Sequence, residues 1–365
     1  GPRGDSQLAA DGSAHAHEGV VPLRRDRTSG RRGAHGGAQR DDGLRAAPRG
    51  PTFDRAVPAG GYAWWYCDVF SDDGTCDLTV IAFVGSVFSP WYRNDRAASL
   101  EADPFAHCAI NIALHSPDHT AWVMTERGAA TLARDAHSWR LGGTQWRWLG
   151  DQLIIDFDEA TKPFFQRMRP RLAGRVVLTP GGAGGVEQAI EPRGAHTWRA
   201  VAPAAHASVQ IEGGPSFSGP AYTDENAGSE GLERGFKRWN WSRMPCAAGT
   251  AVLYDVETRD GQRVQQGHIY GHDGSVQPFA PSQSVELGSG GWRVPRQTRV
   301  TPDGSATVAR TLVASPFYAR SLLRVRANGA DRIAVHETLD MDRFEAPWVR
   351  FLLPWRIRRE ARDAV

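Results

Sequence analysis

The sequence predicts an all-β protein in which two domains follow a polar tail. Beyond about residue 52 the chain contains many short runs rich in Val, Ile, Trp, Tyr and Phe, broken by Gly, Pro and Asp, which is the pattern of strands and turns. Helical periodicity is confined to fragments such as residues 230–238. The chain has 365 residues, and two domains of about 150 residues fit the part beyond the tail.

Residues 1–51 are predicted to form a disordered tail. Gly, Arg, Ala, Asp and His follow one another there without a regular period, and large apolar side chains are few, so this segment would contribute little to a core. We therefore expect ordered structure to begin near Phe53.

Two sets of strands are predicted, and their spacing is typical of sandwiches or barrels. The first set covers residues 61–67, 78–86, 106–115, 121–126, 144–149, 152–158, 171–179, 196–202 and 207–211. The second set covers residues 251–257, 263–269, 292–294, 298–301, 307–313, 323–327 and 333–340. The turn-rich stretch 203–206 near their junction predicts a boundary between domains at 52–205 and 206–365.

Composition excludes several classes of protein. A net charge of +2 and a pI of about 8.5 are too balanced for a dedicated nucleic-acid binder, so we expect no nucleic-acid partner. The four cysteines show no C-x-x-C spacing and form no disulfide framework, which indicates a reducing compartment. No run approaches the roughly 18 apolar residues of a membrane span, and no secretory signal is visible.

Three motif-like strings are weak. The PGGAGG string at 180–185 follows a strand, but no Gly-Lys-Ser/Thr and no adequate helix follows it, so a hairpin turn is expected rather than a phosphate loop. His-x-x-x-His occurs at 115–119 and 268–272, yet Pro117 and Gly271 interrupt the helical geometry that would bring two imidazoles together. We expect no metal site.

Residues 219–243 hold the most informative pattern. Tyr222 and Asp224 are two residues apart and would share one face of a strand, and a Trp-x-Trp pair follows at Trp239 and Trp241. Such a segment could hold one acid beside aromatic walls. The alternative is a turn or strand-end aspartate bonded by backbone amides.

The chain has thirteen tryptophans, a high number for core filling alone. Each one could simply fill a barrel interior. The functional interpretation is an aromatic tunnel for a long apolar ligand, whose ring faces could also stabilise a cation. His196 and Trp198 form a second same-face pair, although a single histidine on a strand is more often structural.

From about residue 52 to residue 359 the chain resembles the carotenoid 1,2-hydratase family, also called hydroxyneurosporene synthases. The resemblance is carried by ordered strings along this length: VPAGGYAWWYCDVFSDDG, LTVIAFVGSVFSPWY, HCAINIALHSP, MTERG, AYTDEN, WNWSR, LYDVETRDG, ETLDMDRF and WVRFLLPWRIRR.

The resemblance implies two lipocalin-like antiparallel β-barrel domains and no metal or organic cofactor. It also implies the addition of water across the terminal 1,2 double bond of acyclic carotenes, such as neurosporene, lycopene and their derivatives, in photosynthetic bacteria. The substrates are then an acyclic carotenoid and water. An alternative stays open, because lipocalin-like proteins also bind apolar ligands without chemistry, or shape them for isomerisation or cyclisation.

The resemblance also implies roles for particular residues. Protonation of the alkene at C2 leaves a tertiary cation at C1, and Asp224 fits the acid because burial among aromatic rings keeps a carboxyl group protonated. Tyr222 would orient the proton or the water, and His196 and Trp198 match a His-x-Trp pair expected near the acid, with the imidazole acting on the water and the indole facing the cation. Residues expected to contact the substrate are Trp64, Trp65, Trp239, Trp241, Tyr254 and Asp255, the last being the competing acid.

The C-terminal segment APWVRFLLPWRIRR combines Trp, Leu and Arg, as at a bilayer interface. Pro354 is expected to break any continuous helix there. We expect a cytoplasmic protein peripherally associated with the cytoplasmic (photosynthetic) membrane. The alternative is that this segment forms the closing strand or strap of the second barrel.

Overall fold

A computed structural model describes residues 50–160, 171–327 and 329–360. All of these residues belong to one compact unit that spans 46–365. Most of them lie in strands, which confirms the all-β prediction, and Phe53 is fully buried. Apart from its last two residues, the tail predicted over 1–51 lies outside the described residues.

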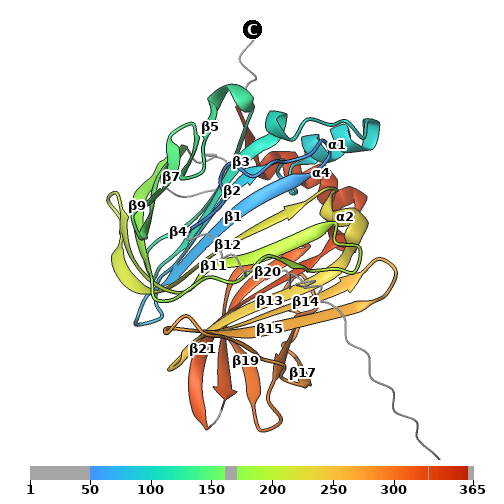
Figure 1. The fold of residues 1–365 in the computed structure, drawn as a ribbon. Coiled ribbons are helices and arrows are strands. Elements are labelled where there is room, and N and C mark those ends of the chain that lie inside the picture. The colour runs from blue at the N-terminus through green and yellow to red at the C-terminus, as the bar shows by residue number, and fades with distance from the viewer. Residues whose placement is uncertain (1–49, 161–170, 328, 361–365) are drawn as a thin grey trace, which may run out of the picture. The chain divides into compact units, whose positions relative to one another are not determined.

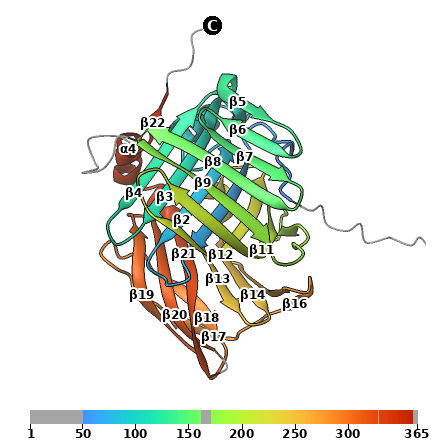
Figure 2. The same cartoon turned by 90° about the vertical axis from the view of Figure 1, so that its left-hand side faces the viewer.

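The larger sheet curls into a half-barrel (Figures 1 and 2). In the described ranges it has 13 strands, in the order β22-β4-β3-β2-β1-β12-β11-β9-β8-β7-β6-β5, with β10 on β11. Their bounds are β1 (Tyr62–Phe70), β2 (Asp77–Val84), β3 (Cys108–His115), β4 (Thr120–Arg127), β5 (Leu132–Arg134), β6 (Ser138–Leu141), β7 (Thr144–Leu149), β8 (Gln152–Ala160), β9 (Arg171–Pro180), β10 (Gln188–Ala189), β11 (His196–Ile211), β12 (Ser216–Gly228) and β22 (Arg358–Arg359).

A second sheet packs on the outer face of the first. Its described strands follow the order β16-β15-β14-β13-β21-β20-β19, and β17 pairs with β18 beside it. Their bounds are β13 (Phe236–Cys246), β14 (Gly249–Thr258), β15 (Arg263–Gly271), β16 (Val276–Pro278), β17 (Gln283–Glu286), β18 (Gln297–Val300), β19 (Ser305–Ala314), β20 (Tyr318–Ala327) and β21 (Ala330–Asp340).

Strand β1 explains how two cores arise from one sheet. Every residue of its sequence YAWWYCDVF is buried, and successive side chains point to opposite faces. Trp65 and the residues of β1 at every second position from it enter the core inside the curled sheet. Trp64 and Tyr66 enter the aromatic core between the two sheets. A strand covered on both faces reads as a continuous apolar run, as this one does.

Helices close one end of the unit. They are α1 (Pro90–Ala98), η1 (Pro104–His107), η2 (Ala129–Thr131), α2 (Leu232–Gly235), α3 (Met341–Phe344) and α4 (Pro347–Arg356). Helix α1 begins with Pro90 after Ser89, whose hydroxyl accepts a hydrogen bond from the Tyr92 amide at 3.0 Å, a standard N-cap. Every helix in the described residues is too short or too polar to cross a bilayer.

Two local predictions are wrong. Residues 292–294 form no strand, since 292 and 293 lie in a turn and 294 has no regular structure. The helical fragment predicted at 230–238 is limited to α2, and from Phe236 onward the chain is β13. In that segment the Trp-x-Trp alternation at Trp239 and Trp241, which buries one face of a strand, prevails over helical spacing.

The C-terminal segment also differs from its prediction. Helix α4 continues through Pro354, because proline there removes one hydrogen bond only two residues before the helix ends. The short strand β22 then pairs in parallel with β4 of the first sheet, so the segment does not close a second barrel. The division at 205 and 206 stays a prediction; those two residues lie inside β11, and β12 belongs to the first sheet.

Candidate active site

Asp224 lies in the middle of β12 and faces the second sheet. Its register partners are Tyr66 on β1 and Ala200 on β11. The residue is 4% exposed and is enclosed by the aromatic core between the sheets. The predicted same-face arrangement of Tyr222 and Asp224 is therefore present.

Three side chains donate hydrogen bonds to the Asp224 carboxyl group. Trp198 Nε1 and the Tyr222 hydroxyl both donate to Oδ2 at 2.9 Å. Asn226 Nδ2 lies 3.1 Å from Oδ1. Because two donors already occupy Oδ2, a carboxyl proton belongs on Oδ1. Side chains, rather than the backbone amides of a turn, thus hold this aspartate.

Burial decides the protonation state of Asp224. Loss of solvation raises its pKa to about 8, although the hydrogen bonds from Trp198 and Tyr222 favour the carboxylate and lower the pKa. A pKa above neutrality leaves most of the group protonated at pH 7. The site therefore contains a neutral carboxylic acid that can donate a proton.

Aromatic rings surround this acid. The Trp241 ring lies 5.1 Å from the Tyr222 ring and 5.6 Å from the Tyr66 ring. On the other side, Tyr254 lies 5.5 Å from the Trp198 ring, and its hydroxyl lies 3.4 Å from Asn226 Oδ1. Such ring faces can stabilise a cation formed between them.

A cavity of about 550 Å³ opens between the two sheets and α4. Trp64 and Trp239 form part of its wall, and Tyr66, Arg320 and Glu337 provide polar groups. Tyr66 is the cross-strand neighbour of Asp224, so the acid lies next to this wall. A volume of this size suits one small molecule or the end of a longer one.

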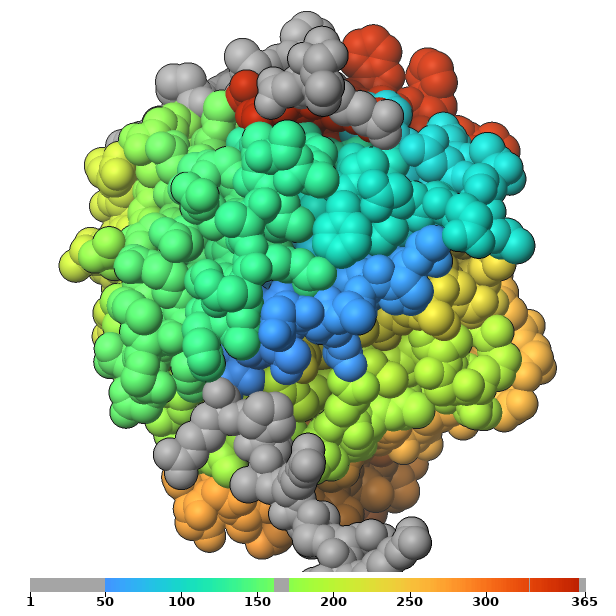
Figure 3. Space-filling model, turned by 45° about the horizontal axis from the view of Figure 1, so that its top comes forward, coloured from blue at the N-terminus to red at the C-terminus, as the bar shows by residue number. Residues whose placement is uncertain are grey.

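The outer part of the cavity is bordered by exposed apolar side chains of α4. Phe351 is 69% exposed, Leu352 44% and Trp355 56%, and all three line the cavity. In Figure 3 the C-terminal residues, coloured red, reach the surface beside the cyan segment that contains α1. Apolar residues are therefore exposed together where the cavity reaches the surface.

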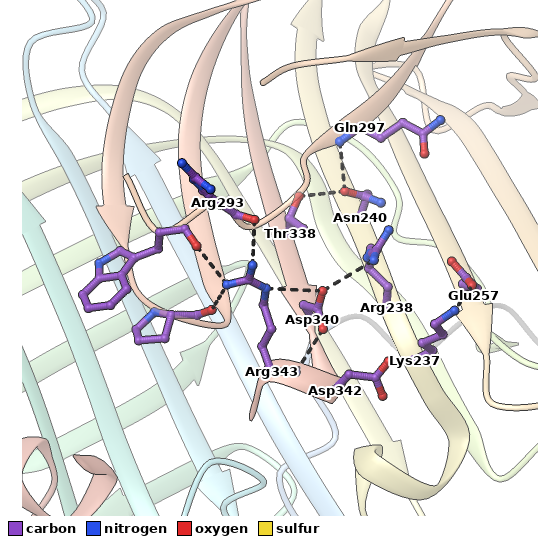
Figure 4. Close-up of polar contacts among 12 residues, drawn as sticks. Lys237, Arg238, Asn240, Glu257, Arg293, Gln297, Thr338, Asp340, Asp342 and Arg343 are labelled. Carbon is purple, nitrogen blue, oxygen red and sulfur yellow. Dashed lines mark hydrogen bonds and ion pairs between the residues drawn. The ribbon is translucent and has the colours of Figure 1, made fainter. Parts of the chain in front are cut away.

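A loop around Trp292 completes this border and is held by one arginine. Trp292 lines the cavity and stacks on Trp348 with 6.1 Å between ring centroids. Arg343 donates to the carbonyl oxygens of Trp292 at 2.8 Å, Arg293 at 3.0 Å and Pro316 at 3.2 Å (Figure 4). The guanidinium fork fixes the loop beside α4.

Several residues predicted to act together are brought together. Tyr222 and Trp198 bond to Asp224, Trp241 and Tyr254 pack around it, and Trp64 and Trp239 line the cavity. Two others lie elsewhere. Trp65 is buried in the core inside the curled sheet. Asp255 forms an ion pair with Arg299 at 2.7 Å.

His196 does not bond to Asp224. It is opposite Gly228 on β12, four residues and about 13 Å along the strand from Asp224. Its Nδ1 lies 2.9 Å from the Tyr62 hydroxyl, and its Nε2 lies 3.6 Å from Glu230. A Cβ at position 228 would lie 2.7 Å from Nδ1, so glycine leaves room for the ring. Burial lowers the pKa of His196 and favours the neutral imidazole.

Sequence reasoning missed a buried ionic cluster next to the acid. Arg320 Nη2 bonds to Asp68 at 2.8 Å and Asp77 at 2.9 Å, and Arg320 Nη1 bonds to Glu337 at 2.5 Å. The alternation of side chains along β1 could have revealed this cluster, because Asp68 shares a face of the strand with Trp64 and Tyr66. A carboxylate in such an aromatic row requires a buried partner.

Comparison with solved structures supports the fold alone. A putative AttH protein from Nitrosomonas europaea aligns with a TM-score of 0.55 and 14% identity, covering 77% of this chain and 92% of that one. CghA in complex with Sch210972 aligns with a TM-score of 0.51 and 12% identity, covering 79% of this chain and 90% of that one.

Comparison with curated sequences is more specific. The acyclic carotenoid 1,2-hydratase of Thiocapsa roseopersicina is 39% identical over 98% of this chain and 87% of its own length. The enzyme of the same name from Rubrivivax gelatinosus is 40% identical over 85% of this chain and 76% of its own length. The family described as carotenoid hydratase CrtC matches residues 80–365. The chain therefore belongs to the carotenoid hydratase CrtC family of hydro-lyases.

Proposed function

We propose that this protein adds water across the terminal 1,2 double bond of an acyclic carotene such as neurosporene or lycopene. The reaction is initiated by an acid and needs no metal or organic cofactor. The observation that carries the proposal is Asp224, a buried carboxyl group with a pKa of about 8 among aromatic rings. The names of the relatives indicate the substrate class.

The chemistry follows from the reactivity of the alkene, whose electron-rich double bond accepts a proton. The Asp224 carboxyl group gives its proton to C2, and a tertiary cation remains at C1. Trp198 and Tyr222 keep the resulting carboxylate bonded through Oδ2. The faces of Tyr66 and Trp241 offer the cation about 0.5 to 2 kcal/mol each when desolvated. Water then attacks C1 to give a tertiary alcohol.

We further propose that the protein associates peripherally with the cytoplasmic membrane, which stores such apolar substrates. The exposed face of α4 supports this, because Phe351 and Trp355 are apolar and Arg356 beside them is exposed. Arginine attracts the anionic surface while aromatic rings enter the interface. A carotene end could then enter the cavity directly from the bilayer.

The test uses the purified chain with lycopene or neurosporene in vesicles, with a chelator present. The proposal predicts a product one water heavier than the substrate. Binding without any product would favour a carrier, and a product of unchanged mass would favour an isomerase or cyclase. Activity that disappears with the chelator and returns with a metal ion would contradict the cofactor-free part of the proposal.

A further inference from the structure

Glu337 is the second carboxyl group beside the proposed reaction site. It lies on β21, opposite Trp241 on β13 and Arg320 on β20. Its side chain is 10% exposed and lines the cavity. It therefore faces whatever occupies this space.

The contacts of Glu337 favour a carboxylate. Its Oε1 accepts hydrogen bonds from the Tyr66 hydroxyl at 2.9 Å and from Arg320 Nη1 at 2.5 Å. Burial raises the pKa of Glu337 above its ordinary value while the Arg320 charge opposes that rise. The two carboxyl groups thus differ, since the donors to Asp224 among the described residues are neutral and Glu337 bonds to a guanidinium.

Glu337 belongs to a cluster of buried charges beside the cavity. Arg243 Nε bonds to Asp68 at 2.8 Å, and Arg320 bonds to Asp68, Asp77 and Glu337. Three carboxylates against two guanidinium groups leave one negative charge in this cluster when all are ionised. Arg356 lines the outer part of the same cavity, and when it is counted three carboxylates face three guanidinium groups, so removing the Glu337 charge need not prevent cation formation.

Aromatic residues connect the two carboxyl groups. The Tyr66 and Tyr222 rings lie 6.1 Å apart; the first hydroxyl bonds to Glu337 and the second to Asp224. The acid and the carboxylate therefore flank one aromatic group. Enzymes that need an acid and a base commonly use a pair of carboxyl groups in unlike environments.

We propose that Glu337 accepts the proton of the attacking water, an inference that rests on the proposed hydration. The C1=C2 bond takes a proton from Asp224 and forms the C2–H bond. Water forms the C1–O bond, and its proton passes to Glu337. Transfer of that proton back to Asp224 through solvent restores both groups, so the net change is the addition of one water.

The experiment is carried out in D2O with wild type, Glu337→Gln and Asp224→Asn, and it measures alcohol formation and deuterium at C2 of recovered carotene. In Glu337→Gln, alcohol formation should fall by about 100-fold, while deuterium still enters C2, because Asp224 forms the cation and then takes a proton back. Asp224→Asn should lose both readouts.

Glu159→Gln is the matched control. Glu159 is buried on β8 and accepts hydrogen bonds from Arg127 at 2.9 and 3.1 Å, so its loss also breaks a buried ion pair. This variant should lose stability and keep wild-type ratios of alcohol to deuterium. If Glu337→Gln does not fold, Glu337→Asp keeps the charge beside Arg320, withdraws the carboxylate by one methylene and should lower the same ratio.

Two outcomes overturn the inference while leaving hydration intact. The first is a folded Glu337→Gln that forms alcohol within about twofold of the wild-type rate, well short of the effect of a general base, or a Glu337→Asp in its place with an unchanged ratio of alcohol to deuterium. The second is a variant that loses deuterium exchange together with alcohol formation, since that loss places Glu337 in the protonation step. Wild-type protein that forms no alcohol instead contradicts the proposed function itself.

Discussion

Asp224 illustrates how one residue acquires its chemistry from its surroundings. Burial raises its pKa to about 8 against the opposing hydrogen bonds of Trp198 and Tyr222. Sequence spacing was enough to predict that Tyr222 shares its face. The family resemblance also implied a protonated carboxyl group, but spacing alone could not predict the burial that causes it, because Trp241 and Tyr254 approach only when the second sheet packs on the first.

The rate of hydration should depend on the protonated form of Asp224. As pH rises through about 8, the fraction of Asp224 that carries a proton falls, and the rate should fall with it. In Tyr222→Phe the carboxylate loses one donor, so its pKa should rise and the decline should move to higher pH. The measurement is kcat against pH for both proteins; a decline that moves to lower pH would contradict this.

Asp255 was the competing acid, and its environment argues against that role. Its carboxylate pairs with Arg299, which also donates to the Gln266 carbonyl oxygen at 2.8 Å. Asp255→Asn should lower the free energy of unfolding by about 2 kcal/mol and leave the rate of the folded enzyme nearly unchanged. Denaturant unfolding and initial rates test this, and a variant with intact stability and no activity would restore Asp255 as the acid.

At the scale of elements, strands were predictable and their partners were not. The apolar run of β1 predicted a strand, and alternation places Trp64 and Trp65 on opposite faces, but the sequence does not show which face meets the cavity. Trp65 was consequently expected at the substrate. In α4, Pro354 suggested a break, whereas the structure tolerates proline in the final turn.

Helix α4 should contribute to membrane binding through its exposed rings. Burying a side chain as large as Phe contributes roughly 2 kcal/mol, so Phe351→Asp should weaken binding to anionic vesicles by at least about tenfold. The control is Leu149→Asp at the end of β7, where Leu149 is 50% exposed. Sedimentation with vesicles measures both; equal binding of the two variants would remove α4 from the interface.

At the scale of the whole described unit, Arg320 joins the two sheets. It lies on β20 of the second sheet and bonds to Asp68 and Asp77 of the first. Sequence reasoning predicted two sets of strands from their spacing. It could not predict this junction, because the charged residues involved are more than 240 positions apart.

Removal of Arg320 should destabilise the unit strongly. Arg320→Ala leaves buried carboxylates without a partner, which costs about 3 to 5 kcal/mol. Arg326→Ala on the same strand removes an exposed pair with Asp331, separated by 3.8 Å, and should cost less than about 1 kcal/mol. Denaturant unfolding compares them, and similar losses would show that the buried cluster contributes little.

The central claim is that Asp224 supplies the proton that starts hydration. The most direct measurement is the initial rate of alcohol formation from lycopene or neurosporene at pH 7 by wild type and Asp224→Asn, each normalised to folded protein. Asparagine keeps an acceptor for Trp198 and Tyr222 but has no carboxyl proton. The account predicts a loss of at least about 100-fold; a variant within about twofold of wild type would contradict it.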